Sequence, residues 1–345
     1  MTREAILVKA TNWIGDLVMS LPALEGVRKS FPKAHITVLV RPPLDELLRG
    51  NPNVDEIMLY DKKGVHKGAA GLARIVREVR ARKFKKAILF QNAFEAALIT
   101  FLARIPERMG YTTDNRGMLL TKGVKLSDKT RAKHQVEYYR DLLAALGLDT
   151  NGETPKLYLT KEEKKRADET LASLGVPGDG VLIGVNPGAQ YGVAKKWHPE
   201  RFGAVADRLV SEFGAKIIIF GGPSDVTAAK AVQASMRREA VNLSGQTSIR
   251  ELMALVRRCS LFITNDSGPM HISAALGVPT LAVFGSTNPS ATGPASRKGR
   301  VVREPVQCSP CLKRMCPQKH YLCMERVKPE KVIRAAAEML RERDE

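Results

Sequence analysis

A short apolar run, a polar loop and an apolar helix follow one another in Leu261-Phe-Ile-Thr-Asn-Asp-Ser-Gly-Pro-Met-His-Ile-Ser-Ala-Ala-Leu276. The run at 261–264 is short and apolar, as in strands that are buried on both faces of a parallel sheet. Pro269 suits the first turn of a helix, with Ser267 or Gly268 at its cap. A strand that passes through a tight loop into a helix is the repeating unit of α/β proteins, so this stretch predicts that fold class.

The same alternation extends in both directions along the chain. Strands are predicted at 6–8, 36–40, 57–59, 87–90, 181–185, 216–220, 261–264 and 280–284, and helices around 24–31, 72–79, 161–174, 199–213, 224–239, 249–258 and 269–276. Pro22 leaves two interpretations of the first helix, which either kinks there or begins near Ser20. The two series predict two doubly wound domains, residues 1–155 and 156–345, with ligands in the cleft between them at the carboxyl ends of the strands.

The composition is that of an ordinary globular protein. Of the 345 residues, 44% are hydrophobic and 26% are charged, which excludes a disordered or collagen-like chain. No apolar run is long enough for a membrane span, and Lys9 and Asp16 interrupt any secretory signal. We therefore expect a cytoplasmic protein, in which free thiols are the usual state of cysteine.

The net charge of +19 is spread over both halves of the chain. Its densest run, residues 80–86, ends a predicted helix, where basic side chains interact favourably with the helix macrodipole and face solvent. A second interpretation is attraction to an anionic substrate or membrane surface, and both can hold. Aromatic residues make up only 6% of the chain, which argues against a surface for nucleic acid.

The loop after the first predicted strand, residues 11–16, carries a candidate reactive group. Gly15 permits a tight turn, and Asp16 places a carboxylate near the start of the following helix. One interpretation is that Asp16 only caps that helix. The other is a functional carboxylate at the carboxyl end of a strand, which the large Trp13 in the same loop favours because no cap requires it.

Two loops of the second series have features of nucleotide sites. In the first, Gly188 and its neighbour Ala189 can present backbone N–H groups to a phosphate, and Lys195 adds a positive charge. The alternative is a plain Pro-Gly turn with surface lysines. In the second, Gly221-Gly-Pro-Ser-Asp225 follows a predicted strand, and its acidic residue is suited to ribose hydroxyls.

The loop at residues 265–271 gives the most specific signal. Free N–H groups at the start of the following helix form an anion site. Asp266 is placed to accept a hydroxyl group and His271 to donate to a phosphate, although a histidine within a helix can also be purely structural.

The cysteines cluster near the end of the chain. Cys308, Cys311, Cys316 and Cys323 have the spacing C-x2-C-x4-C-x6-C, whereas Cys259 stands alone. Four thiols so close together can hold zinc, but the longer gaps match no common zinc finger, so free thiols and oxidised pairs remain open. P-loop, zinc-protease and nucleophile-elbow motifs are absent from the sequence, and we expect no catalytic metal.

Three separated loops together resemble the ADP-heptose:lipopolysaccharide heptosyltransferase family: Asn12-Trp-Ile-Gly-Asp16, Pro187-Gly-Ala189 with Lys195-Lys-Trp197, and Asn265-Asp-Ser-Gly268 with His271. The resemblance runs from about residue 5 to residue 340. Because Trp13 is present, the chain is more similar to the heptosyltransferase II branch than to the heptosyltransferase I branch. It implies a GT-B fold, in which two Rossmann-like domains face each other across a cleft, the N-terminal one for the acceptor and the C-terminal one for the nucleotide sugar.

The resemblance also implies an activity and a set of site residues. The activity is an inverting transfer of heptose from ADP-heptose to the inner-core heptose of lipopolysaccharide, without a cofactor. Asp16 lies at the position of the family's general base, and Lys195 at the position that contacts the donor phosphate and sugar. The remaining donor-binding positions are Gly188, Ala189, Asp225, Thr247, Asp266, Ser267, Gly268 and His271, with Thr247 near the adenine.

The basic surface suits an acceptor in an anionic leaflet, so the resemblance implies peripheral binding to the cytoplasmic face of the inner membrane. Two alternatives stay open from the sequence. Within the same family, the chain can be heptosyltransferase I or another core glycosyltransferase. From a different class, it can be a non-catalytic protein that binds nucleotides or nucleic acid through its positive charge.

Overall fold

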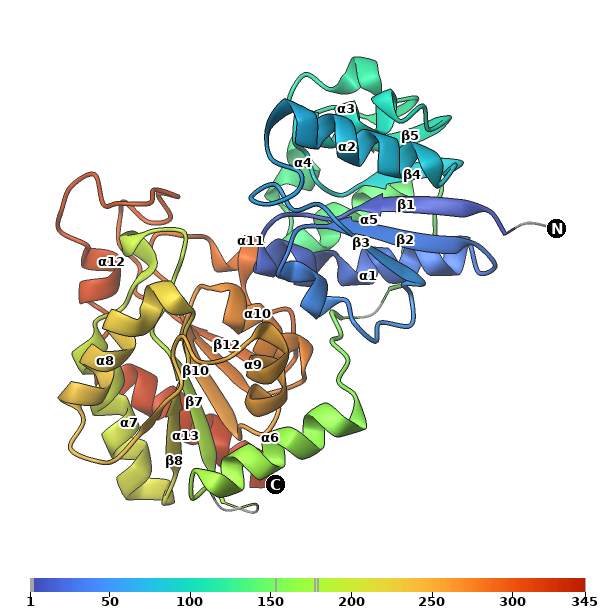
Figure 1. Cartoon of the computed structure of the whole chain (residues 1–345). Coiled ribbons are helices and arrows are strands. Elements are labelled where there is room, and N and C mark those ends of the chain that lie inside the picture. The colour runs from blue at the N-terminus through green and yellow to red at the C-terminus, as the bar shows by residue number, and fades with distance from the viewer. Residues whose placement is uncertain (1–2, 153, 177, 179, 345) are drawn as a thin grey trace. The chain divides into compact units, whose positions relative to one another are not determined.

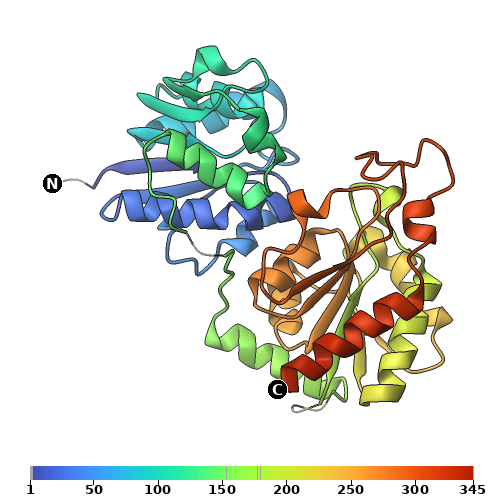
Figure 2. The same ribbon diagram turned by 180° about the vertical axis from the view of Figure 1, so that it is seen from behind.

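The protein, seen in a computed structural model, consists of two compact units, Met1–Tyr158 and Leu159–Glu345. The structure describes residues 3–152, 154–176, 178 and 180–344. Each unit is a parallel sheet with helices packed on it, as Figures 1 and 2 show from opposite sides. Among the described residues, no helix is both long and apolar enough to span a membrane.

The first unit has the strand order of Rossmann-type folds, β3-β2-β1-β4-β5-β6, with all neighbours parallel. Its strands are β1 (Ala5–Lys9), β2 (His35–Val40), β3 (Glu56–Leu59), β4 (Lys86–Leu89), β5 (Glu107–Tyr111) and β6 (Lys122–Val124). Its helices are α1 (Ile14–Ser30), η1 (Leu44–Leu47), α2 (Gly68–Ala81), α3 (Phe94–Leu102), η2 (Gly117–Leu119), α4 (Asp128–Ala132) and α5 (Gln135–Ala145). The order reverses between β1 and β4, and the loops that follow the two strands at such a switch point are where doubly wound sheets usually bind ligands.

The second unit repeats this topology in the order β12-β11-β10-β7-β8-β9, with the reversal between β7 and β10. Its strands are β7 (Leu182–Asn186), β8 (Lys216–Ile219), β9 (Val241–Asn242), β10 (Leu261–Asn265), β11 (Thr280–Val283) and β12 (Gly299–Val302). Its helices are α6 (Lys161–Ser173), η3 (Val193–Lys195), α7 (Pro199–Phe213), η4 (Pro223–Asp225), α8 (Val226–Ser235), α9 (Ile249–Val256), α10 (Gly268–Ala275), α11 (Pro289–Thr292), α12 (Leu322–Glu325) and α13 (Pro329–Asp344).

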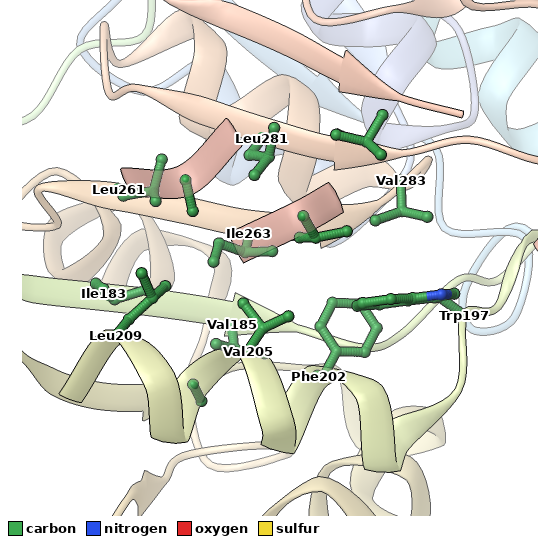
Figure 3. Close-up of a cluster of buried hydrophobic side chains, with 14 of the residues drawn as sticks. Ile183, Val185, Trp197, Phe202, Val205, Leu209, Leu261, Ile263, Leu281 and Val283 are labelled. Carbon is green, nitrogen blue, oxygen red and sulfur yellow. The ribbon is translucent and has the colours of Figure 1, made fainter. Parts of the chain in front are cut away.

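The core of the second unit lies between its sheet and α7. Figure 3 shows Val185 of β7, Ile263 of β10 and other strand residues facing the apolar side of α7. Trp197, which is 1% exposed, closes this core: its ring lies 4.9 Å from that of Phe202, and its Nε1 donates to the carbonyl oxygen of Val327 at 2.9 Å. Because the other face of the sheet is also covered, the central strands β7 and β10 are apolar up to the polar residues at their carboxyl ends.

All eight predicted strands are present, and the described residues form four further strands that the sequence does not predict: β5, β6, β9 and β12. The last three are sheet edges, where a strand needs no continuous apolar run, and β5 begins with the charged Glu107 and Arg108. Helix α1 begins at Ile14 and passes through Pro22, so the interpretation in which it begins near Ser20 is wrong. Helix α8 ends at Ser235, earlier than the predicted residue 239.

The buried position of Trp197 leads to a stability prediction. Trp197→Ala removes a large side chain and a buried hydrogen bond, and we expect the free energy of unfolding to fall by about 3–5 kcal/mol. Urea unfolding followed by far-UV circular dichroism measures this. Trp13→Ala is the matched control, because Trp13 is 55% exposed and its loss should cost less than about 0.5 kcal/mol. Equal effects of the two substitutions would contradict the prediction.

Candidate active site

In the second unit, one buried asparagine joins the loop that follows β7 to the end of β10. Asn265 ends β10 and is fully buried. Its Nδ2 donates to the carbonyl oxygen of Pro187 at 2.7 Å, and its Oδ1 accepts from the backbone N–H of Trp197 at 3.0 Å. The segment from residue 187 to residue 197 is therefore fixed at both ends to the last residue of β10, at the point where the strand order reverses.

The start of α10 is organised by a second asparagine. Nδ2 of Asn186 donates to the hydroxyls of Thr264 and Ser267, both at 3.1 Å, and to the carbonyl oxygen of Gly188 at 3.2 Å. Ser267, one of the two predicted N-cap residues, is the N-cap of α10. Its side chain makes no capping hydrogen bond. The serine thus orients the loop and leaves backbone N–H groups of the first turn for a ligand.

Two of the predicted site residues form a buried ion pair. Nζ of Lys195 lies 2.6 Å from Oδ2 of Asp266, and the two side chains are 13% and 4% exposed. The hydroxyl of Thr287 donates to the same carboxylate oxygen at 2.6 Å. No pattern in the sequence indicates that Lys195 and Asp266 are paired. Thr287 is a site residue that the sequence analysis missed, although it follows the predicted strand at 280–284 as the other site loops follow theirs.

The loops after β7 and β8 also meet. A Cβ atom on Gly188 would lie 2.3 Å from Cγ of Asp225, so the two loops approach this closely because residue 188 has no side chain. Asp225 is buried and accepts a hydrogen bond from the backbone N–H of Gly222 at 3.1 Å. The structure therefore brings Gly188 and Asp225 together, and Ala189, next to Gly188, is buried as well.

The two other donor-side candidates lie differently. His271 is 5% exposed and lies one turn inside α10. Thr247 is half-buried and precedes Ser248, the N-cap of α9. It follows β9, the edge strand, so the topology places it two strands away from β7. Thr247 is thus at the periphery of the group formed by the other donor-side residues.

In the first unit, Asp16 lies in the first turn of α1, half-buried. The N-cap is Trp13, so the interpretation of Asp16 as the cap itself is wrong, although a carboxylate in a first turn still favours the helix electrostatically. Burial raises the pKa of Tyr139 on α5 well above 10, and the nearby Asp16 carboxylate raises it further. Asp16 is thus close to α5 as well as at the carboxyl end of β1.

Two residues before this loop, at the end of β1, lies a buried lysine that the sequence analysis missed. Lys9 ends β1, is 1% exposed, and donates through Nζ to the carbonyl oxygen of Ala10 at 2.9 Å. Burial and then the charge of Arg41 lower the pKa of Lys9 to about 7. Arg41 and Lys62 lie 3.6 and 2.7 Å from the carboxylate of Glu95. The sequence feature that could have indicated this residue is a lysine at the end of an otherwise apolar strand.

The four clustered cysteines do not form a metal centre in the part of the chain that the structure describes. No group of three or more His, Cys, Asp or Glu side chains there is arranged to hold a metal ion. Cys308, Cys311 and Cys316 are half-buried, Cys323 is buried, and all are free thiols, as is Cys259. Burial raises the pKa of Cys259 to about 12, so this thiol is inert.

Comparison with known proteins agrees with this geometry. Residues 72–322 match glycosyltransferase family 9 (heptosyltransferase). The chain is 32% identical to lipopolysaccharide heptosyltransferase 2 of Salmonella typhimurium and 30% identical to that of Escherichia coli, over 86% of this chain and 87% of each relative. It matches the crystal structure of a glycosyl transferase family 9 protein from Veillonella parvula with a TM-score of 0.90 at 30% identity, covering 99% of both chains. The structure of E. coli ADP-heptose LPS heptosyltransferase II matches with a TM-score of 0.84 at 26% identity, covering 99% of this chain and 100% of that one.

Two Rossmann-type units with polar loops at their switch points define an α/β transferase of the GT-B class, as the sequence predicted. The chain belongs to glycosyltransferase family 9, the heptosyltransferase family. The resemblance inferred from the three loops is thus confirmed, and the interpretation as a non-catalytic binding protein is set aside.

The buried ion pair generates a prediction about stability. Lys195→Met leaves the Asp266 carboxylate buried beside Thr287 without its cation, and we expect the free energy of unfolding to fall by about 3 kcal/mol. The double variant Lys195→Met/Asp266→Asn should regain most of that loss, because no buried charge remains. Trp197 fluorescence in urea, in a Trp13→Phe background, follows the second unit. A double variant as unstable as the single one would contradict the pairing.

Proposed function

We propose that this glycosyltransferase moves heptose from ADP-heptose to the inner-core heptose of lipopolysaccharide with inversion, as a heptosyltransferase II. The observation that carries the proposal is the convergence of Lys195, Asp266 and the uncapped start of α10 at the switch point of the second unit. Such a group suits a diphosphate. The relatives named heptosyltransferase 2 and the similar structure of an ADP-heptose enzyme support the choice of donor and acceptor.

The second unit binds the donor in this proposal. Backbone N–H groups of Gly188, Ala189 and Gly268 face the diphosphate, with Ser267 holding the loop. Asp225, buried against Gly188, accepts hydrogen bonds from the ribose hydroxyls. The remaining roles rest on the positions of these residues in the family motifs. Asp266, beside Lys195, accepts a hydrogen bond from a sugar hydroxyl, and His271 donates one to a phosphate. Thr247, at the periphery, contacts the adenine.

The reaction requires one proton transfer and one displacement. The Asp16 carboxylate accepts the proton of the acceptor hydroxyl while its oxygen forms a bond to the anomeric carbon of the donor. The bond between that carbon and the diphosphate oxygen breaks, and its electron pair leaves with ADP. Lys195 stabilises the negative charge that grows on the leaving diphosphate. These steps need no catalytic metal and no cofactor.

The first unit binds the acceptor in this proposal. Two cations, Arg41 and Lys62, lie beside one carboxylate, Glu95, at the carboxyl edge of the first sheet. An excess of positive charge here suits an acceptor that carries anionic groups. The net charge of +19 further supports peripheral binding to the anionic cytoplasmic face of the inner membrane.

The donor site is tested by ADP binding. His271→Ala and Lys195→Ala should each weaken ADP binding, measured by titration calorimetry, because each removes a donor to phosphate. With Lys195→Ala, turnover should fall more than donor affinity, since charge on the leaving group grows in the transition state. Lys196→Ala is the matched control and should bind ADP normally. An unchanged ADP affinity in His271→Ala would remove that residue from the phosphate site.

The base is tested by Asp16→Asn, which keeps the shape of the side chain but cannot accept a proton. We expect turnover to fall about 10²–10⁴-fold, the range for a positioned general base, with ADP affinity unchanged. Asp128→Asn, also in the first turn of a helix, should retain full activity. Turnover is measured with saturating ADP-heptose and heptosylated acceptor. Near-normal turnover of Asp16→Asn would refute the base assignment, and replacing the acceptor by one without heptose separates heptosyltransferase II from heptosyltransferase I.

A further inference from the structure

The segment that carries the clustered cysteines lies against the donor loops. Residues 308–316, called here the cysteine strap, are part of the long loop between β12 and α12 (Figure 1). The backbone N–H of Leu312 donates to the carbonyl oxygen of Ser286 at 2.8 Å. The hydroxyl of Ser309 donates to the carbonyl oxygen of Gly285 at 2.6 Å. Ser286 and Gly285 directly precede Thr287, which contacts Asp266. The strap is therefore joined to the loop after β11 beside the ion pair.

The strap is also joined to the loop that carries Lys195. The hydroxyl of Tyr191 donates to the carbonyl oxygen of Leu312 at 2.9 Å, and the backbone N–H of Ala194 donates to that of Arg314 at 3.1 Å. A Cβ atom on Gly192 would lie 2.2 Å from the carbonyl oxygen of Arg314. The two backbones touch here, and a glycine is required for lack of space, since its φ of 163° is an extended value open to any residue.

These contacts place two cations against one aromatic ring. Nζ of Lys195 lies 4.7 Å from the centre of the Tyr191 ring, and Cζ of Arg314 lies 5.3 Å from the same centre. Lys195 is committed to Asp266 at 2.6 Å. Arg314 is exposed, and among the described residues it has no carboxylate within salt-bridge distance. Tyr191 thus holds the guanidinium beside the ion pair without neutralising it.

The charge balance shows why a second cation matters. The buried pair of Lys195 and Asp266 has a net charge near zero. It can therefore orient a diphosphate through a hydrogen bond, but it adds little net electrostatic attraction. Arg314 brings a full positive charge to the same place. Its planar guanidinium can donate two parallel hydrogen bonds to phosphate oxygens, which an ammonium group cannot do.

We propose that Arg314 is a further phosphate-binding residue of the donor site, and that the cysteine strap and Tyr191 hold it there. The inference rests on the proposed donor site of the second unit. It gives the cysteine segment a role as one wall of that site, and it assigns the diphosphate two cations of different kinds: Lys195 within the buried pair and Arg314 at the solvent side.

Arg314→Gln tests the inference by titration calorimetry with ADP and with adenosine. ADP affinity should fall about tenfold to a hundredfold, as for the loss of charge-assisted hydrogen bonds. Adenosine affinity should not change, because it has no phosphate. Lys313→Gln, an exposed neighbour in the same strap, is the matched control and should bind both as the unaltered protein does. An ADP affinity of Arg314→Gln within about twofold of the unaltered protein would overturn the inference.

A second variant separates the position of the guanidinium from its presence. Gly192→Ala keeps Arg314 but forces the strap away from the Lys195 loop, so ADP affinity should fall while circular dichroism and adenosine binding are unchanged. Lys195→Ala distinguishes the two proposals. If Lys195→Ala weakens ADP binding and Arg314→Gln does not, only the role of Arg314 is wrong. If neither does, the donor site itself is wrong.

Discussion

The second unit depends on what the side chain of Asn265 does at the end of β10. Its amide binds both the beginning and the end of the segment 187–197, through Pro187 and Trp197. Because Asn265 is fully buried and its amide is used on both sides, that segment has little freedom to move as a whole. The positions of Tyr191, Gly192 and Lys195 follow from this anchor, and so does the pairing of Lys195 with the residue that follows Asn265.

The same anchor connects the site to the core. Trp197 is held by Asn265 through its backbone and by Val327 through its indole, and its ring packs on α7. Val327 follows α12, whose Cys323 and Met324 belong to the same core cluster. The segment that carries Lys195 and helix α12 are thus positioned by one apolar cluster, which is the support that the proposed anion site needs.

The sequence allowed the prediction of the central strands and, with them, of the loops that carry Asp16, Gly188 and Asp266, because a buried parallel strand is a continuous apolar run and site loops follow its carboxyl end. Edge strands such as β6 and β12 lack that signal. The ion pair of Lys195 and Asp266 and the contact of Gly188 with Asp225 join residues far apart in the chain, and no local pattern encodes which partners tertiary packing will select. The strap was interpreted through its cysteines alone, although its contacts are made mainly by backbone groups.

The two units share one strand order but present opposite chemistry at their switch points. The first offers a carboxylate in the first turn of α1, and its strand β1 ends in a buried lysine whose pKa is lowered to about 7. The second offers N–H groups and cations around a carboxylate that is already neutralised. In a displacement, a proton must leave the nucleophile and negative charge must appear on the leaving group. In the proposed reaction the base, Asp16, lies on the first unit and the phosphate-binding Lys195 on the second, so separate groups meet the two demands. The cations Arg41 and Lys62 of the first unit lie beside the carboxylate of Glu95. The repeated fold therefore supplies two equivalent switch points, and in the proposed reaction the side chains at each one decide which half of the reaction it serves.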